Sequence, residues 1–89
     1  MRTIYKYPLK DTIFLPQGAK VLSVGDQEGE RVLWALVDTN NLLEARNFSI
    51  IGTGWDVTND PGIHHSKFIG TIHQPPFVWH VFDDTRSTN

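Results

Sequence analysis

Apolar and polar residues alternate along this chain over short stretches, a pattern typical of half-buried β-strands rather than of helices. The stretches are rich in β-branched and aromatic residues and end at Gly, Pro, Asn or Asp, which favours strands joined by turns. Seven segments have this composition and these boundaries: Thr3–Tyr7, Thr12–Leu15, Val21–Gly25, Arg31–Asp38, Asn47–Thr53, Lys67–His73 and Phe77–Asp83.

The same pattern separates central strands from edge strands. Val32–Val37 is apolar at every position, and Phe77–Phe82 is apolar except at His80, so both stretches are expected inside a sheet with both faces covered. Thr3–Tyr7 alternates, and Thr12–Leu15 is short and is followed by a proline. These two segments are therefore predicted as edge strands.

Helical periodicity is nearly absent. Only Asn41–Arg46 has a local helical look, and at that length it supports one turn at most. We therefore predict an all-β fold, a small antiparallel sandwich or partly closed barrel of about six or seven short strands. Residues 1–83 form a single β domain, and residues 84–89 are expected to be a flexible polar tail.

Composition narrows the function classes. A length of 89 residues allows one domain, and 11% aromatic residues argue against a disordered chain. Eight Lys and Arg stand against ten Asp and Glu, so charge-driven binding to nucleic acid is not expected. Tyr5 and Tyr7 lie on one face of their strand and Lys6 on the other, which separates stacking groups from charge. The chain has no Cys, which excludes a disulfide scaffold and a thiolate metal site.

Two further expectations concern the cellular location and the oligomeric state of the protein. The first strand ends at Pro8 instead of continuing as an apolar run, so we expect no secretory signal and a cytosolic location. No stretch is long enough to cross a bilayer. Three Trp and two strands that are apolar on both faces exceed what one small domain covers, so we expect the chain to form a homo-oligomer.

The Gly52-Thr53-Gly54 segment is the main candidate site. It resembles a phosphate-cradling loop, but Trp55 follows where a nucleotide-binding loop needs Gly-Lys-Ser/Thr. We therefore interpret it as a bend beside a ligand or a protein partner, followed by the loop Gly54–Ser66 with its two histidines. The candidate binding residues are Gly52, Thr53, Gly54, Trp55, His64 and His65.

His73 and His80 leave two interpretations open. If Pro75-Pro76 forms a tight hairpin tip, both histidines lie on one face as diagonal neighbours, about 7–8 Å apart at Cα. A metal would need a third ligand, and no HExxH or His-x-His spacing supplies one. The favoured interpretation is that His80 is a partly buried strand residue, and neither a metal nor another cofactor is expected.

No arrangement of nucleophile, base and orienting group is visible. The serines lack a Gly-x-Ser-x-Gly elbow, and the acidic pairs lie in a hairpin loop and in the tail. The sequence therefore favours a protein that is not an enzyme.

Five stretches carry a resemblance over most of residues 3–83: Thr3–Tyr7, Pro16–Val24, Leu33–Asp38, Phe48–Gly54, and Phe68–Thr71 with Val78–Phe82. In their order and spacing the chain resembles a family of small bacteriophage and prophage proteins whose function is unknown. The resemblance implies a phage origin and the host cytoplasm, and it supplies no catalytic residues. The chain departs from the family in the loop Val57–Ser66 and in the tail after Asp83.

These observations lead to three functional hypotheses. The first is a non-enzymatic phage accessory protein that binds a host protein, for host takeover or as an anti-defence inhibitor. The second is an oligomeric sponge for a small ligand such as a nucleotide signal. The third is a minor structural protein of the virion. The first is favoured because small phage proteins without enzyme motifs commonly act by binding, which is an argument by association.

Overall fold

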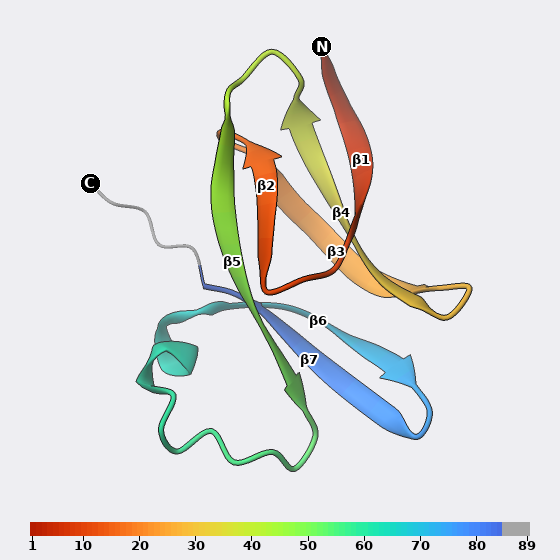
Figure 1. The fold of residues 1–89 in the computed structure, drawn as a ribbon, viewed down its shortest axis with the longest axis vertical. Coiled ribbons are helices and arrows are strands. Elements are labelled where there is room, and N and C mark those ends of the chain that lie inside the picture. The colour runs from red at the N-terminus through yellow and green to blue at the C-terminus, as the bar shows by residue number, and fades with distance from the viewer. Residues whose placement is uncertain (85–89) are drawn as a thin grey trace.

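Seven antiparallel strands and one 3-10 turn make up the protein in the computed structural model, which describes residues 1–84 (Figure 1). The prediction of an all-β fold is confirmed. The strands are β1 (Arg2–Pro8), β2 (Thr12–Pro16), β3 (Lys20–Gln27), β4 (Glu30–Asp38), β5 (Leu43–Gly52), β6 (Lys67–Gln74) and β7 (Phe77–Asp83), and the 3-10 turn η1 is Pro61–His65. No helix among the described residues is long and apolar enough to span a membrane.

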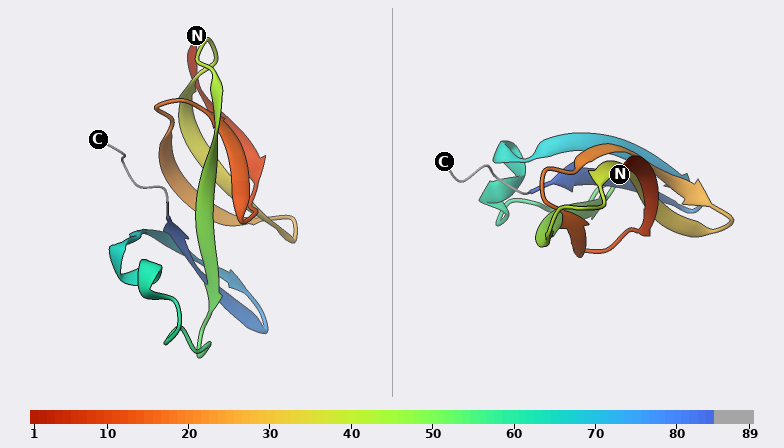
Figure 2. Two further views of the ribbon diagram at one scale, coloured as in Figure 1. Left: turned by 60° about the vertical axis from the view of Figure 1, so that its left-hand side comes forward. Right: turned by 90° about the horizontal axis from the view of Figure 1, so that it is seen from above.

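The strands form two sheets and no closed barrel. The first sheet has the order β1-β4-β3 and the second has the order β2-β5-β7-β6. The long strand β5 pairs with β2 through its first half and with β7 through its second half. The molecule is a thin slab of 40 × 35 × 15 Å, and its flatness is clearest from above (Figure 2).

The core fills the space between the two sheets. In β4, Leu33, Ala35 and Val37 are at most 2% exposed, because alternate residues of a strand point to one face. The other members of the buried cluster are Leu9, Ile13, Leu15, Ala19, Phe48, Ile72 and Val81. Trp34, of opposite parity in β4, is half-buried and lies over Gly25, where a Cβ would approach its ring to 3.1 Å.

The predicted places of the strands within the sheets are confirmed. β4 lies between β1 and β3, and β7 lies between β5 and β6. β1 and β2 are edge strands, as their short or alternating patterns indicated. The condition set for His73 and His80 is met: Pro75-Pro76 forms the hairpin tip with a cis peptide, Gln74 lies opposite Phe77, and His73 lies opposite Val78.

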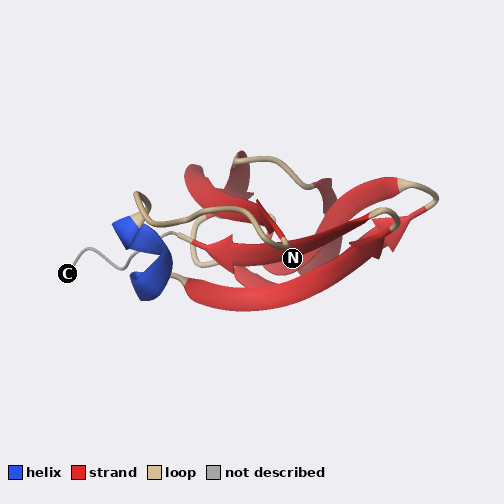
Figure 3. Cartoon of the chain, turned by 90° about the horizontal axis from the view of Figure 1, so that it is seen from below, coloured by secondary structure: helices blue, strands red, loops and turns tan. Residues whose placement is uncertain are grey.

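The helical interpretation of Asn41–Arg46 is wrong. β5 begins at Leu43, four residues before the predicted start, and its first half pairs with β2 from Thr12↔Asn47 to Pro16↔Leu43. Tertiary pairing of this kind outweighs a weak local helical preference. The 3-10 turn occurs instead at η1, where Pro61 occupies the first turn, and it lies beyond the ends of the strands (Figure 3).

Most of the expected polar tail, residues 84–89, lies outside the described residues. Its first residue, Asp84, accepts hydrogen bonds from the hydroxyls of Ser49 and Ser66, each at 2.6 Å. The Asp84 backbone N–H also donates to the Asn47 carbonyl at 2.9 Å. Asp84 therefore joins the end of β7 to β5 and to the residue that follows η1.

Candidate functional site

A tight turn follows β5 and positions the candidate site. The Thr53 N–H donates to the Val78 carbonyl at 3.0 Å, and the Trp55 N–H donates to the Gly52 carbonyl at 3.1 Å. Gly54 has φ +87°, a conformation that a residue with a Cβ rarely adopts. The Gly-Thr-Gly sequence therefore reverses the chain directly after the last strand pair of β5.

The turn folds Trp55 back over the end of β5. An added Cβ on Gly52 would lie 2.6 Å from Trp55 Nε1, so the indole occupies the space of the missing side chain. The same ring meets Trp79 of β7 edge to face, with centroids 5.5 Å apart. Trp55 is thus held in place although it remains 57% exposed.

Trp79 is the centre of an exposed aromatic cluster, which we define as Trp55, Phe77 and Trp79 together with Arg31. Phe77 stacks on Trp79 at 5.2 Å and 21°, and is 53% exposed. The Arg31 guanidinium of β4 lies 4.8 Å from the centroid of Trp79, which gives a cation–π contact between the two sheets.

Hydrogen bonds fix the orientation of Trp79. Its Nε1–H donates to Gln74 Oε1 at 3.2 Å, and the Gln74 side-chain amide donates to the Gly29 carbonyl at 2.9 Å. Trp79 is therefore tied to the hairpin between β3 and β4 as well as to its own hairpin. The aromatic cluster is rigid at its centre and open at Trp55 and Phe77.

A small, open apolar cavity of about 240 Å³ lies beside the turn and the loop that follows it. Trp55 and His80 contribute to its walls, and the loop and η1 supply Val57 and Ile63. Ile51 and Phe82 come from β5 and β7 and complete the apolar lining. The cavity adjoins the aromatic cluster because Trp55 belongs to both.

Both ring nitrogens of His80 lie against threonine hydroxyls. Nε2 is 2.7 Å from Thr53 Oγ1, and Nδ1 is 3.2 Å from Thr71 Oγ1. The Thr53 hydroxyl also lies 3.4 Å from the Val78 carbonyl, and the tautomer of His80 decides whether this hydroxyl donates to Nε2 or accepts from it. The two hydroxyls therefore hold the imidazole between the turn after β5 and strand β6.

Asp56 adds a fixed negative charge next to Trp55. The Thr58 hydroxyl, and then the Thr58 backbone N–H, donate to its carboxylate and hold the pKa of Asp56 below its ordinary value. Asp56 therefore adds an anion next to Trp55 in the chain, while Arg31 supplies a cation against the ring of Trp79.

The structure brings together only part of the predicted site. Gly52, Thr53, Gly54 and Trp55 all line the cavity. His64 and His65 are exposed on η1 and are not among its lining residues, which include their neighbour Ile63 instead. Within residues 1–84 no three His, Asp or Glu side chains gather in a way that would hold a metal ion.

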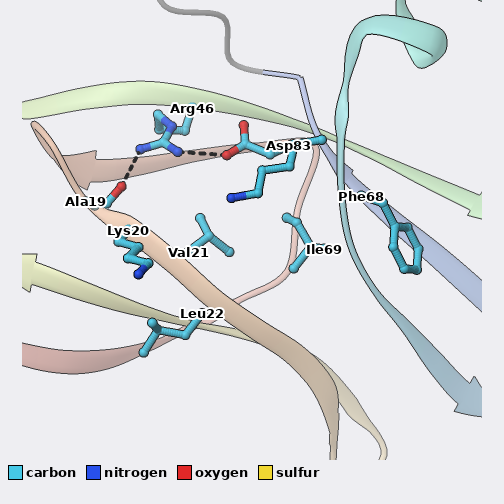
Figure 4. Close-up of a pocket in the computed structure, with 9 residues that line it drawn as sticks. Ala19, Lys20, Val21, Leu22, Arg46, Phe68, Ile69 and Asp83 are labelled. Carbon is cyan, nitrogen blue, oxygen red and sulfur yellow. Dashed lines mark hydrogen bonds and ion pairs between the residues drawn. The ribbon is translucent and has the colours of Figure 1, made fainter.

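A larger cavity, about 580 Å³, lies elsewhere and was not predicted (Figure 4). It opens between the edges of β3 and β6. Arg46 Nη2 pairs with Asp83 at 2.8 Å and Nη1 donates to the Ala19 carbonyl at 3.0 Å, while Lys20 and Lys67 also line the cavity. Arg46 shares a strand face with buried Phe48, and this signal was missed because β5 was expected to begin at Asn47.

Comparison with known proteins places the chain in a family. Residues 1–89 match the family model described as a domain of unknown function, DUF7352. Neither the curated proteins nor the solved structures contain a significant match. Because the match extends over the whole chain, the protein belongs to the DUF7352 family.

Proposed function

We propose that this DUF7352 protein is a non-enzymatic binding protein that docks on another protein through the aromatic cluster and the adjoining cavity. We further propose that it is a phage accessory protein and that its partner is a host protein in the host cytoplasm, where it acts in host takeover or against a defence system. The observation that carries the proposal is the exposed pair Trp55 and Phe77, held on Trp79 by packing.

The composition of the aromatic cluster supports a protein partner. Trp, Tyr and Arg are enriched among the residues that contribute most to protein–protein affinity. Trp55 offers a large rigid surface, and its position over Gly52 is set before any partner arrives. Preorganisation of this kind reduces the entropy lost on binding.

The size of the cavity also supports a protein partner. At about 240 Å³ it falls below the roughly 300–1,000 Å³ typical of sites that enclose a small-molecule ligand. Its apolar walls suit one side chain of a partner, inserted between Trp55 and the loop. His80 is held between the hydroxyls of Thr53 and Thr71, which supports a structural role for this residue.

The test is affinity capture from host lysate with the wild-type chain and two variants. We expect the wild type to retain a specific partner, and Trp55→Ala to weaken that binding by roughly thirtyfold or more, since a central Trp contributes at least about 2 kcal/mol. Leu42→Ala, which truncates an exposed apolar residue in the turn between β4 and β5, is the matched control and should bind as the wild type. Capture that is equal for all three proteins would contradict the proposal.

A small-ligand sponge is the second candidate. The observation that favours it is the cavity itself, in which Thr53 and His80 are polar groups beside an indole ring. A thermal-shift screen over cyclic and linear nucleotides would detect it, since a ligand that binds only the folded state raises the unfolding temperature. Stabilisation lost in Trp55→Ala would support the sponge, and the absence of any stabilisation would exclude it for nucleotides.

A further inference from the structure

The two sheets have four edges among the described residues, and three of them are protected against pairing with another chain. β2 has five residues and ends at Pro16. β3 has a register shift at Leu22, and β6 has one at Ile69. Short length, proline and bulges are the devices that natural sheets use to block edge-to-edge association.

β1 also ends at a proline, Pro8, but it is longer than β2 and, unlike β3 and β6, has no bulge. Its seven residues keep an unbroken register with β4, from Arg2↔Asp38 to Pro8↔Val32. Ile4 is 57% exposed and Tyr5 is 45% exposed. A long, regular edge with exposed apolar side chains is a template for a further strand.

Two backbone bonds at the ends of the ladder show which groups of β1 face away from β4. Thr39 N–H donates to the Met1 carbonyl, and Leu9 N–H donates to the Arg31 carbonyl. Bonded and non-bonded pairs alternate along an antiparallel ladder, so the odd residues of β1 bond to β4. The N–H and C=O groups of Arg2, Ile4 and Lys6 therefore point to the open edge.

We propose that β1 pairs antiparallel with β1 of a second copy of this chain across a two-fold axis at Tyr5, so that the two first sheets become one six-stranded sheet. In this register each Ile4 lies opposite Lys6 of the second copy, and the two residues exchange a pair of backbone bonds. Each Arg2 N–H also meets the carbonyl of Pro8 of the second copy, while the Arg2 carbonyl gains no backbone bond there because proline has no N–H.

The charges select this register. A shift of the axis to Ile4 sets Arg2 opposite Lys6 of the second copy, and a shift to Lys6 sets that lysine opposite its own symmetry mate. Directly opposed like charges destabilise a strand pair. With the axis at Tyr5, Lys6 faces Ile4 and Arg2 faces Pro8, so no cation is directly opposed to another.

The side chains on the core-facing side of β1 also fit a second copy. Tyr5 and Tyr7 already meet edge to face, with centroids 6.4 Å apart. The two-fold axis sets Tyr5 against Tyr5 of the second copy and extends this contact to both chains, since aromatic cross-strand pairs are favourable. The dimer uses no residue of the aromatic cluster and does not depend on the proposed binding function.

The test measures dimer mass by light scattering and the dissociation constant by sedimentation, for the wild type and two variants of the exposed residue Ile4. Ile4→Lys introduces two like-charge pairs with Lys6 and should weaken the dimer by roughly tenfold or more. Ile4→Glu, the matched control, creates two opposite-charge pairs and should bind at least as tightly as the wild type. With the axis at Ile4, by contrast, Ile4→Glu would oppose two carboxylates and dissociate the dimer.

A cross-link gives an independent measurement in a chain without cysteine. Tyr5→Cys should form a disulfide-linked dimer on oxidation, because non-hydrogen-bonded partners lie about 4.5 Å apart at Cα. Ile4→Cys, which does not face itself, should remain uncross-linked. A monomeric wild type at high micromolar concentration, dissociation of the Ile4→Glu dimer, or efficient cross-linking of Ile4→Cys would each overturn the proposal.

Discussion

At the scale of single residues, Gly52 decides where Trp55 lies. The indole fills the position of the missing Cβ and reaches Trp79 from there. Glycine at this position therefore serves a close approach between a ring and the backbone. The position of Trp55 in the aromatic cluster therefore depends on the absence of a side chain at Gly52.

The substitution Gly52→Ala should lower the free energy of unfolding by about 1–2 kcal/mol, since the added methyl overlaps the indole and forces it to move. In a Trp55→Ala background the same substitution should cost less than about 0.5 kcal/mol, because no ring is displaced. Urea unfolding of the four proteins gives this double-mutant cycle. An equal loss in both backgrounds would show that Gly52 acts through its backbone alone.

Tyr7 provides a test by pH. Burial, and then the neighbouring Tyr5, raise the pKa of Tyr7 above its ordinary value of 10.0. The folded state therefore disfavours the phenolate, so the contribution of Tyr7 to stability should be constant below pH 10.0 and be lost as the pH rises above that value. Urea unfolding at increasing pH should show a smaller alkaline loss in Tyr7→Phe than in the wild type, and equal losses would contradict the prediction.

The sequence identified the bend at Gly52–Trp55, because glycine spacing and a lone Trp are local signals. It did not reveal the contact between Trp55 and Trp79, which depends on the pairing of β5 with β7. His64 and His65 were selected for their chemistry, yet the apolar residues Val57 and Ile63 of the same loop face the cavity. Residue type alone does not show which way a loop side chain points.

At the scale of elements, the strands followed from alternation and from turn residues, and the central and edge positions followed from apolar continuity. The error at β5 has a physical cause. Leu42, Leu43 and Ala45 suggest a helical turn, whereas pairing with β2 turns Leu43 and Ala45 outward and Arg46 inward. Long-range pairing of this kind leaves no trace in a short window of sequence.

Arg46 and Asp83 link β5 to β7 through an ion pair whose side chains are only 11% and 12% exposed. Arg46→Ala should lower the free energy of unfolding by about 3 kcal/mol, since one partner of a largely buried pair is removed. The double variant Arg46→Met with Asp83→Leu should lose less than the single variant, because neither charge remains.

Urea unfolding measures both effects. Lys20→Ala, in an exposed residue of the same cavity, is the control and should change the free energy of unfolding by less than about 0.5 kcal/mol. A loss for Arg46→Ala as small as that of the control would show that the ion pair contributes little.

At the scale of the whole molecule, the chain is two sheets thick and only 15 Å deep. Each buried residue therefore lies close to solvent on some side, and the edges of the sheets form a large share of the surface. Assembly through an edge adds backbone bonds without adding a new core, which suits a domain of this size.

Amide hydrogen exchange along β1 should show this assembly directly. The amides of Thr3, Tyr5 and Tyr7 bond to β4 and should exchange slowly at every concentration. Those of Ile4 and Lys6 face the open edge and should become protected only as the dimer forms. Rapid exchange of Ile4 and Lys6 at high concentration would contradict the proposed dimer.

The three tryptophans, finally, allow intrinsic fluorescence to report on two separate surfaces of the molecule. Trp34 lies over Gly25 and opposite Lys6 of β1, whereas Trp55 and Trp79 contact each other at the aromatic cluster. The fluorescence emission of Trp34 should therefore respond to events at the β1 edge, and that of the Trp55–Trp79 pair to docking of a partner. Replacing Trp34 with phenylalanine would leave a spectrum that reports docking of a partner. Replacing Trp55 and Trp79 instead would leave one that reports events at the β1 edge.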